Sequence, residues 1–352
     1  MDWPPLAAYP ARGNAFDGRQ REGNAVGGMK RNLARILGGI AAVGAVGIGL
    51  ASKRSKISPQ AWAIIALLAR LSPDMGRSGG IEGVVERDRA RGPARPSKGL
   101  LKRIDFHDEG QGPDRRFRAS RKGEAPNRLR LLYLHGGAYV MDLQALQWRL
   151  VDGLLKRVGG EVVIPIYPLA PEHGWQDSAA AAERAYLALV AAHGAANVVI
   201  VGDSAGGGLA LALAQKLRDE ESPAPAALLL LSPWLDVGAS GADQPALEAD
   251  DPVLSINVLR ECGRLWAKGL PLDDPRISPL FGDQDRLPPT MVLSGTRDIL
   301  DSDARRLAQA NPDAIVYHYP GMVHDWPIFP VPEARRALDQ AAAFIRHSLP
   351  GL

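Results

Sequence analysis

From about residue 128 onward, hydrophobic positions alternate between short apolar runs and longer stretches with helical spacing. The short runs are apolar throughout, as expected for strands buried on both faces of a parallel sheet. The predicted strands are 128–134, 161–167, 197–201, 226–231, 290–294 and 314–319. Helices are predicted to begin near residues 143, 177, 302 and 332, and another follows residue 201 and ends near 219. This alternation predicts an α/β fold with helices on both faces of a mostly parallel central sheet.

The segment 234–275 interrupts this alternation with a loop and one predicted helix, which indicates an insertion over the sheet. Cys262 lies in that helix and is the only cysteine of the chain, so an intramolecular disulfide and a thiolate metal site are both excluded. A lone cysteine at such a position behaves as a small buried apolar residue. The insertion is predicted to span about 236–270.

The first 56 residues have a different character. Residues 1–28 are rich in Gly, Pro, Arg and Asn without an apolar period, which predicts disorder. A basic stretch from Met29 and an apolar run at 36–51 resemble a signal peptide. The run is short for a bilayer span, and the basic cluster at 53–56 opposes export. Two interpretations stay open, a targeting or membrane-associating segment and an apolar tail or packed helix, so the location could be cytoplasmic, membrane-associated or exported.

Residues 57–100 are predicted to connect this segment to the main domain at 101–352. Ser58 as N-cap and Pro59 at the first helical position predict a helix at 60–71. Residues 74–100 are dense in Gly, Arg and Pro, which favours a linker.

Charge adds little to this picture. The chain of 352 residues carries a formal charge of +3, and its basic excess lies in the first third. Aromatic residues make up 6%, and they are not interleaved with basic ones as in nucleic-acid-binding surfaces. Nucleic acid is therefore not an expected partner.

A glycine-rich turn at Ser204 is the first candidate for chemistry. The strand at 197–201 leads into Gly202-Asp203-Ser204-Ala205-Gly206 and directly into a helix. The flanking glycines permit a tight turn that exposes the serine hydroxyl at the edge of the sheet, and the helix N-terminus favours developing negative charge. A phosphate loop would need a lysine at Walker spacing, which this sequence lacks. Ser204 is therefore a candidate nucleophile.

A second small-residue motif, His135-Gly136-Gly137, ends the strand at 128–134. Small residues let backbone N–H groups approach a reacting oxygen, and this place in the chain suits a second oxyanion donor. His135 is interpreted as a structural residue that holds the loop through a hydrogen bond. Asp203 is expected to bond locally and position the turn at Ser204.

Taken in order along the chain, these motifs resemble the hormone-sensitive-lipase-like family of α/β-hydrolases, the bacterial group IV esterases. The resemblance covers about residues 128–350 and rests on His135-Gly136-Gly137-Ala138, on the segments 167–173, 232–234, 274–279 and 295–300, on Gly202-Asp203-Ser204-Ala205-Gly206-Gly207 and on Gly321-Met322-Val323-His324. It implies an α/β-hydrolase fold whose helical cap is built from residues before about 100 and from 236–270.

The resemblance also implies a site. Ser204 corresponds to the nucleophile of the family, and the N–H groups of Gly137, Ala138 and Ala205 correspond to its oxyanion hole. Ala138 stands where many members have glycine. An alanine keeps the backbone N–H, so we expect the hole to persist provided that no positive φ is needed there. Neither a metal nor an organic cofactor is implied.

In this fold the acid and base follow the nucleophile in the order Ser, Asp or Glu, His. Asp298 follows the strand at 290–294 and His324 follows the strand at 314–319, so both are expected at the edge that carries Ser204. The alternatives are two helix-capping acids, a strand histidine and a surface histidine: Asp301, Asp303, His318 and His347. Asp325 replaces a glycine usual in the family, and its carboxylate is predicted to raise the pKa of His324 and the pH optimum.

Three further residues have structural interpretations. Glu172 and Arg276 are expected to form internal ion pairs or hydrogen bonds, and Trp234 to line the pocket or pack in the core. The expected function is hydrolysis of small carboxylic esters, with short to medium acyl chains, through an acyl-enzyme. Hydrolysis of an amide, lactone or carbamate and a non-catalytic binding role are the alternatives. The sequence predicts neither the oligomeric state nor the natural substrate.

Overall fold

The computed structural model describes residues 57–71, 80–124 and 127–352. The predicted targeting segment at 1–56, with its apolar run at 36–51, lies outside the described residues. In the part of the chain that is described, none of the helices combines the length and the hydropathy needed to cross a bilayer.

An eight-stranded sheet in the order β1-β2-β4-β3-β5-β6-β7-β8 forms the centre of the fold. β1 and β2 are antiparallel to their neighbours, and β3 to β8 run parallel. The strands are β1 Ile104–Glu109, β2 Arg116–Arg121, β3 Arg130–Leu134, β4 Glu161–Pro165, β5 Val198–Asp203, β6 Ala227–Leu231, β7 Thr290–Arg297 and β8 Ile315–Val323. All six predicted strands are present, and the expected mostly parallel α/β-hydrolase sheet is confirmed.

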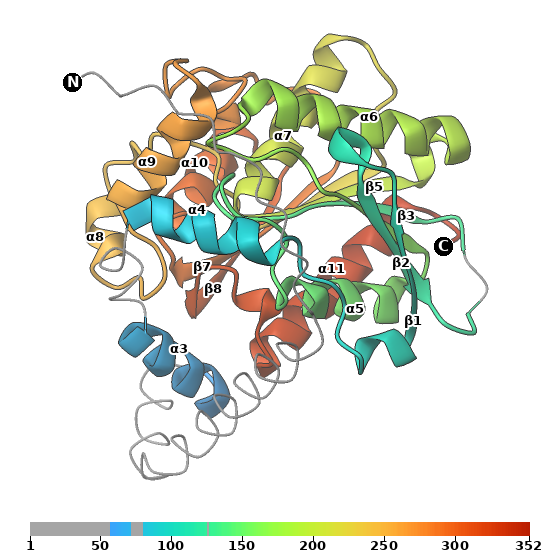
Figure 1. The fold of residues 1–352 in the computed structure, drawn as a ribbon, viewed down its shortest axis with the longest axis horizontal. Coiled ribbons are helices and arrows are strands. Elements are labelled where there is room, and N and C mark those ends of the chain that lie inside the picture. Colours follow the sequence, from blue (N-terminus) through green and yellow to red (C-terminus); the bar gives the residue numbers. More distant parts are fainter. Residues whose placement is uncertain (1–56, 72–79, 125–126) are drawn as a thin grey trace, which may run out of the picture. The chain divides into compact units, whose positions relative to one another are not determined.

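Helices cover both faces of this sheet, with α6 and α7 on one side and α5 and α11 on the other (Figure 1). Neighbouring residues on a strand face opposite sides. Leu132 of β3 therefore packs in the cluster with α6 and α7, whereas Leu131 packs in the cluster with α5 and α11. The helices are α3 Pro59–Leu71, α4 Gly80–Arg91, α5 Gln147–Val158, α6 Trp175–His193, α7 Ala205–Asp219, α8 Gln244–Glu248, α9 Ile256–Ala267, α10 Asp301–Ala310 and α11 Pro332–Ser348.

Strands β1 and β2 were not predicted from the sequence. Their inward positions carry Phe106, Phe117 and Ala119, but nearly every position between them is charged or polar. An antiparallel pair at the edge of a sheet needs only one apolar face, so its hydrophobic signal is half that of a central strand.

The prediction of a linker at 74–100 is wrong over residues 80–91, which form the helix α4. Ile81, Val85 and Asp88 are its buried positions and form one narrow stripe, while most other positions are exposed. Contacts with the rest of the domain, which composition does not reveal, stabilise this helix. The insertion differs too, since it holds both α8 and α9 instead of one helix.

Helix α3 begins as predicted and is tied to the last helix. The Oγ atom of Ser58 accepts a hydrogen bond from the N–H of Ala61 at 3.1 Å, which is an N-cap interaction. The N–H and hydroxyl of Ser58 donate to the two carboxylate oxygens of Glu333 on α11, at 2.6 and 2.8 Å. Glu333 therefore joins α3 to the domain.

Replacing Glu333 by alanine is expected to lower the free energy of unfolding by about 1 to 3 kcal/mol, because two donors on Ser58 lose their charged acceptor. The measurement is the urea midpoint of unfolding. Arg336→Ala, at an exposed position of the same helix, is the matched control and should leave the midpoint unchanged. An equal midpoint for both variants would show that the Ser58 contact does not stabilise the domain.

Candidate active site

Ser204 occupies the single position between β5 and α7, at the predicted turn. Its φ of 51° and ψ of −122° lie in a region that non-glycine residues rarely adopt. A Cβ atom at Gly206 would collide with the carbonyl oxygen of Leu134, so only glycine lets α7 begin this close to β3. The turn places the side chain of Ser204 in the wall of a pocket.

Asp298 and His324 directly follow β7 and β8, and the parallel strands bring both to the edge that carries Ser204. The Nε2 atom of His324 lies 2.9 Å from the Oγ atom of Ser204. Its Nδ1 atom lies 3.0 Å from Oδ2 of Asp298, whose other oxygen accepts the N–H of Leu300 at 2.9 Å. All three side chains are buried. The structure thus brings together the three residues that were predicted to act as a triad.

The competing residues take part in other interactions. Asp301 lies 2.7 Å from Oγ of Ser294 and 2.6 Å from Nδ1 of His318, and Asp303 accepts backbone N–H groups of Leu235 and Asp236. The expectation that these two acids cap α10 is wrong, because the N-cap is Leu300 and their bonds reach other segments. His347 is exposed, as predicted.

The glycine motif forms a tight turn beside Ser204. The N–H of Val140 donates to the carbonyl of Gly137 at 3.0 Å, and the two central residues, Ala138 and Tyr139, have φ of 53° and 61°. These are features of a type I′ turn. The condition placed on Ala138 is therefore not met, since its φ is positive, and the conformation costs about 1 to 2 kcal/mol for a residue with a Cβ atom.

The N–H groups of Gly137, Ala138 and Ala205 have no hydrogen-bond acceptor among the described residues. Gly137 and Ala138 line the same pocket as Ser204, and Ala205 is the first residue of α7, where an N–H has no intrahelical acceptor. The three predicted donors thus have no internal acceptor in the described part of the chain, and Gly137 and Ala138 line the same pocket as Ser204.

Asp203 connects the turn at Ser204 to the glycine motif. Its buried carboxylate accepts hydrogen bonds from the hydroxyl of Tyr133 at 2.6 Å, the N–H of Gly136 at 2.9 Å and the amide of Gln147 at 2.7 Å. The expectation of a local bond is wrong, since these partners lie 56 to 70 residues away in the sequence. His135 is buried, and its Nδ1 atom lies 2.9 Å from the carbonyl oxygen of Gly136, a contact of the kind that the predicted structural role requires.

A pocket of about 630 Å³ opens over Ser204 and His324. Its apolar wall includes residues from three helices outside the sheet layer, α3, α4 and α9: Ala69, Ile81, Val84, Val258, Leu259 and Cys262. Both segments expected to build the cap therefore contribute to it. Burial raises the pKa of Cys262 to about 12, so this residue stays a neutral thiol in the pocket wall. Trp234 is fully buried and stacks on Tyr139, in agreement with a core role.

Several carboxylates surround His324. Oδ2 of Asp325 lies 3.3 Å from Nε2 of His324. Burial alone lowers the pKa of His324, but the charges of Asp325, Asp298 and Asp251 outweigh it and raise that pKa to about 10. Burial, with the nearby Asp203 and Asp298, also raises the pKa of Asp325. The imidazolium and the Asp325 carboxylate stabilise each other, so protonated His324 persists to higher pH.

A general base must be neutral to act, so with His324 in the role predicted from the sequence, activity should increase with pH through the pKa of His324. In Asp325→Asn and Asp325→Gly the positive imidazolium loses an adjacent carboxylate, so the pKa of His324 should fall. The acidic limb of the kcat/KM profile is therefore expected to shift to lower pH by about one unit or more. Asparagine and glycine both tolerate the left-handed backbone at this position, where φ is 50°. Asp250→Asn, at an exposed position in the pocket wall, is the control. An unchanged limb in both Asp325 variants would contradict the effect.

Asp251 was not singled out from the sequence. Its carboxylate accepts the N–H of Ile299 at 2.9 Å and the N–H of Val253 at 2.7 Å, so it ties the α8–α9 loop to the residue after Asp298. Burial and the charge of Asp298 raise the pKa of Asp251 to about 6. No local pattern marks this residue, because its role depends on a contact 48 residues away.

The ion pairs expected at Glu172 and Arg276 are present. Glu172 pairs with Arg89 of α4 at 2.8 Å, and Arg276 pairs with Asp274 at 2.7 Å. Glu172, Asp274 and Arg276 lie in loops, whereas Arg89 lies in α4.

Comparison with known proteins identifies the family to which this fold belongs. The family described as the alpha/beta hydrolase fold matches residues 131–328. An acetyl-hydrolase of Streptomyces hygroscopicus is 36% identical over 223 residues, which is 61% of this chain and 75% of that protein. A triacylglycerol lipase of Mycobacterium tuberculosis is 36% identical over 199 residues, which is 55% of this chain but only 41% of that longer protein. A hormone-sensitive lipase structure from a metagenome library has a TM-score of 0.72 and 25% identity, covering 81% of this chain and 97% of that one. The chain therefore belongs to the alpha/beta-hydrolase family, among its hormone-sensitive-lipase-like esterases.

Proposed function

We propose that the protein hydrolyses carboxylic esters of small molecules with Ser204 as nucleophile, His324 as general base and Asp298 as the acid that orients the histidine. The observation that carries the proposal is the continuous set of contacts from Ser204 Oγ to His324 Nε2 and from His324 Nδ1 to Asp298, set in the wall of a pocket. Family membership and relatives named as a lipase and an acetyl-hydrolase support it.

In the first half of the reaction, the Oγ atom of Ser204 attacks the ester carbonyl while Nε2 of His324 takes its proton. The buried carboxylate of Asp298 keeps the other imidazole proton on Nδ1 and stabilises the imidazolium. The carbonyl oxygen becomes negative, and the N–H groups of Gly137, Ala138 and Ala205 would donate hydrogen bonds to it. The alcohol then leaves with the proton from Nε2.

In the second half, water attacks the acyl-enzyme from the same side. His324 removes a proton from the water, the oxyanion forms again beside the same N–H groups, and collapse releases the acid with the proton returned to Ser204. These steps need only the side chains and N–H groups named above.

The pocket favours short to medium acyl chains. Its volume of about 630 Å³ and its aliphatic wall suit an apolar substituent, which gains roughly 0.8 kcal/mol for each buried methylene group. We expect kcat/KM to increase from acetate toward butyrate and octanoate and to fall for palmitate, in line with the preference that the family resemblance implies.

The test is hydrolysis of p-nitrophenyl acetate, butyrate, octanoate and palmitate, combined with mass spectrometry after treatment with an alkyl phosphonate. Turnover of at least one ester and a single phosphonate adduct on Ser204 are the expected results. A folded protein that hydrolyses none of them and forms no adduct would contradict the proposal. Matched p-nitroanilides, a lactone and a carbamate in the same assay distinguish the alternative substrates, and tight binding without turnover would indicate a binding role.

A further inference from the structure

The turn at Gly137 carries unusual backbone strain for a part of the proposed oxyanion hole. Ala138 and Tyr139 follow one another with positive φ, and neither is glycine. Such a conformation persists only where the surrounding structure holds it. The contacts that hold the end of this turn are therefore part of what makes the site.

Helix α4 supplies two of these contacts from neighbouring residues. A guanidinium nitrogen of Arg89 donates to the carbonyl of Val140 at 2.9 Å, and the other terminal nitrogen donates to the carbonyl of Ala170 at 2.7 Å. The carboxylate of Asp88 accepts the N–H of Asp142 at 2.8 Å. Asp88 is 6% exposed, so its bond to the backbone is screened from water.

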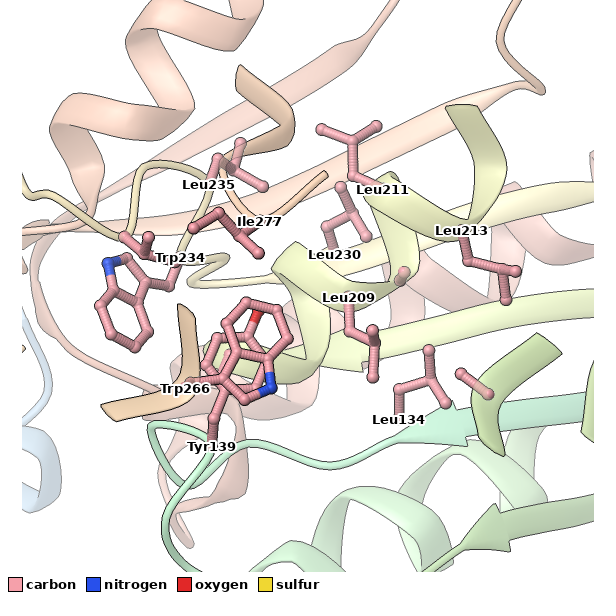
Figure 2. Close-up of a cluster of buried hydrophobic side chains, with 14 of the residues drawn as sticks. Leu134, Tyr139, Leu209, Leu211, Leu213, Leu230, Trp234, Leu235, Trp266 and Ile277 are labelled. Atoms are coloured by element: carbon pink, nitrogen blue, oxygen red, sulfur yellow. The ribbon is translucent and has the colours of Figure 1, made fainter. Parts of the chain in front are cut away.

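The same turn is held on its other side by aromatic packing. The ring of Tyr139 stacks on Trp266 of α9 with centroids 3.5 Å apart, and on Trp234 at 5.6 Å (Figure 2). The carbonyl of Tyr139 accepts the N–H of Ala170, which lies in the loop that Arg89 also contacts. The side chain of Tyr139 is thus fixed by the core, whereas the backbone that follows it is fixed by α4.

We infer that Asp88 and Arg89 are positioning residues of the oxyanion hole: by fixing the backbone at Val140 and Asp142, they keep the N–H groups of Gly137 and Ala138 aimed at the developing oxyanion. This inference rests on the proposed esterase function. It gives α4 a role beyond its contribution of Ile81 and Val84 to the pocket wall. If α4 only covered the pocket, substitutions in it would change the affinity for substrate. If α4 holds the turn, substitutions at Asp88 and Arg89 weaken stabilisation of the transition state.

The test compares Arg89→Ala, Asp88→Ala and the conservative Arg89→Lys with Arg87→Ala, an exposed position of the same helix. For p-nitrophenyl butyrate, we expect kcat to fall by about 10- to 100-fold in the first two variants with KM within threefold, since loss of a full oxyanion donor costs about 10²- to 10³-fold. Arg89→Lys, which keeps one cationic donor, should lie between Arg89→Ala and the wild type. Arg87→Ala should match the wild type.

A second measurement reports on stabilisation of the oxyanion separately from the rest of the reaction. A butyl trifluoromethyl ketone accepts the Ser204 oxygen at its carbonyl carbon, the carbonyl oxygen becomes an alkoxide, and the proton passes to His324. Its inhibition constant should increase by the same factor as kcat falls, while that of the non-fluorinated butyl methyl ketone, which stays a neutral ketone and forms no alkoxide, should change much less. Circular dichroism verifies that each variant is folded. If Arg89→Ala does not fold, Arg89→Lys takes its place in the comparison with the wild type.

Two results would overturn the inference while the esterase proposal stands. One is an active wild type with Arg89 variants whose kcat and ketone affinity stay within twofold of it. The other is a loss expressed in KM alone, which would make α4 a substrate cover only. A wild type that neither hydrolyses an ester nor binds the ketone would instead overturn the proposed function, and the positioning role with it.

Discussion

Ser204→Ala is expected to lower kcat for p-nitrophenyl butyrate by about 10⁴-fold or more, because the variant retains binding and oxyanion donors but has no oxygen to form the acyl-enzyme. The hydroxyl lies 2.9 Å from Nε2 of His324, at the turn between β5 and α7. KM should change little, since the pocket wall is untouched. The measurement is steady-state hydrolysis with enzyme at micromolar concentration.

The control for this prediction is Ser222→Ala, just beyond the far end of α7, which should retain wild-type activity. Phosphonate labelling should disappear in Ser204→Ala and persist in Ser222→Ala. If Ser204→Ala kept more than a tenth of the wild-type kcat, another residue would have to be the nucleophile.

Asp298→Asn is expected to lower kcat by about 10³- to 10⁴-fold with little change of fold. Oδ2 of Asp298 accepts the proton on Nδ1 of His324 at 3.0 Å, and Oδ1 accepts the N–H of Leu300. An asparagine that keeps the bond to Leu300 presents its NH₂ group to Nδ1. The imidazole then carries its proton on Nε2, which can no longer accept the proton of Ser204.

The matched variant is Asp301→Asn, three residues along the chain. Asp301 is equally buried but contacts His318 and Ser294 in place of His324. This variant should lower stability, because a buried charged hydrogen bond is lost, yet keep kcat within threefold of the wild type. The reverse result, with Asp301→Asn inactive and Asp298→Asn active, would reassign the acid.

The strands that could be predicted most directly are those buried on both faces. Strands β3 to β6 and the first half of β7 are apolar almost throughout, and this signal survives in a single sequence. β8 lies at the edge of the sheet and is mostly exposed or half-buried, so its apolar residues give a weaker signal. β1, β2 and α4 each bury one narrow stripe of side chains, and most of their other residues are charged or polar. In α4 the buried stripe is Ile81, Val85 and Asp88. Their stability comes from tertiary contacts that local composition does not contain.

The same distinction holds within the site. Ser204, Asp298 and His324 each follow a predicted strand, and parallel strands end at one edge, so chain order was sufficient to group them. The partners of Asp203 and Asp251, by contrast, lie tens of residues away in the sequence. The positive φ of Ala138 also has no sequence signature, because alanine gives no sign that it will adopt a conformation typical of glycine.

Helix α4 presents different residues to the pocket and to the oxyanion turn. Ile81 and Val84 line the pocket, while Asp88 and Arg89, one turn further on, form hydrogen bonds with the backbone of Asp142 and Val140. For enzyme engineering, this division separates substrate range from turnover. A library randomised at positions 81 and 84 can reshape the acyl site while the turn keeps its support, whereas randomising 88 and 89 would discard active clones whatever their pocket.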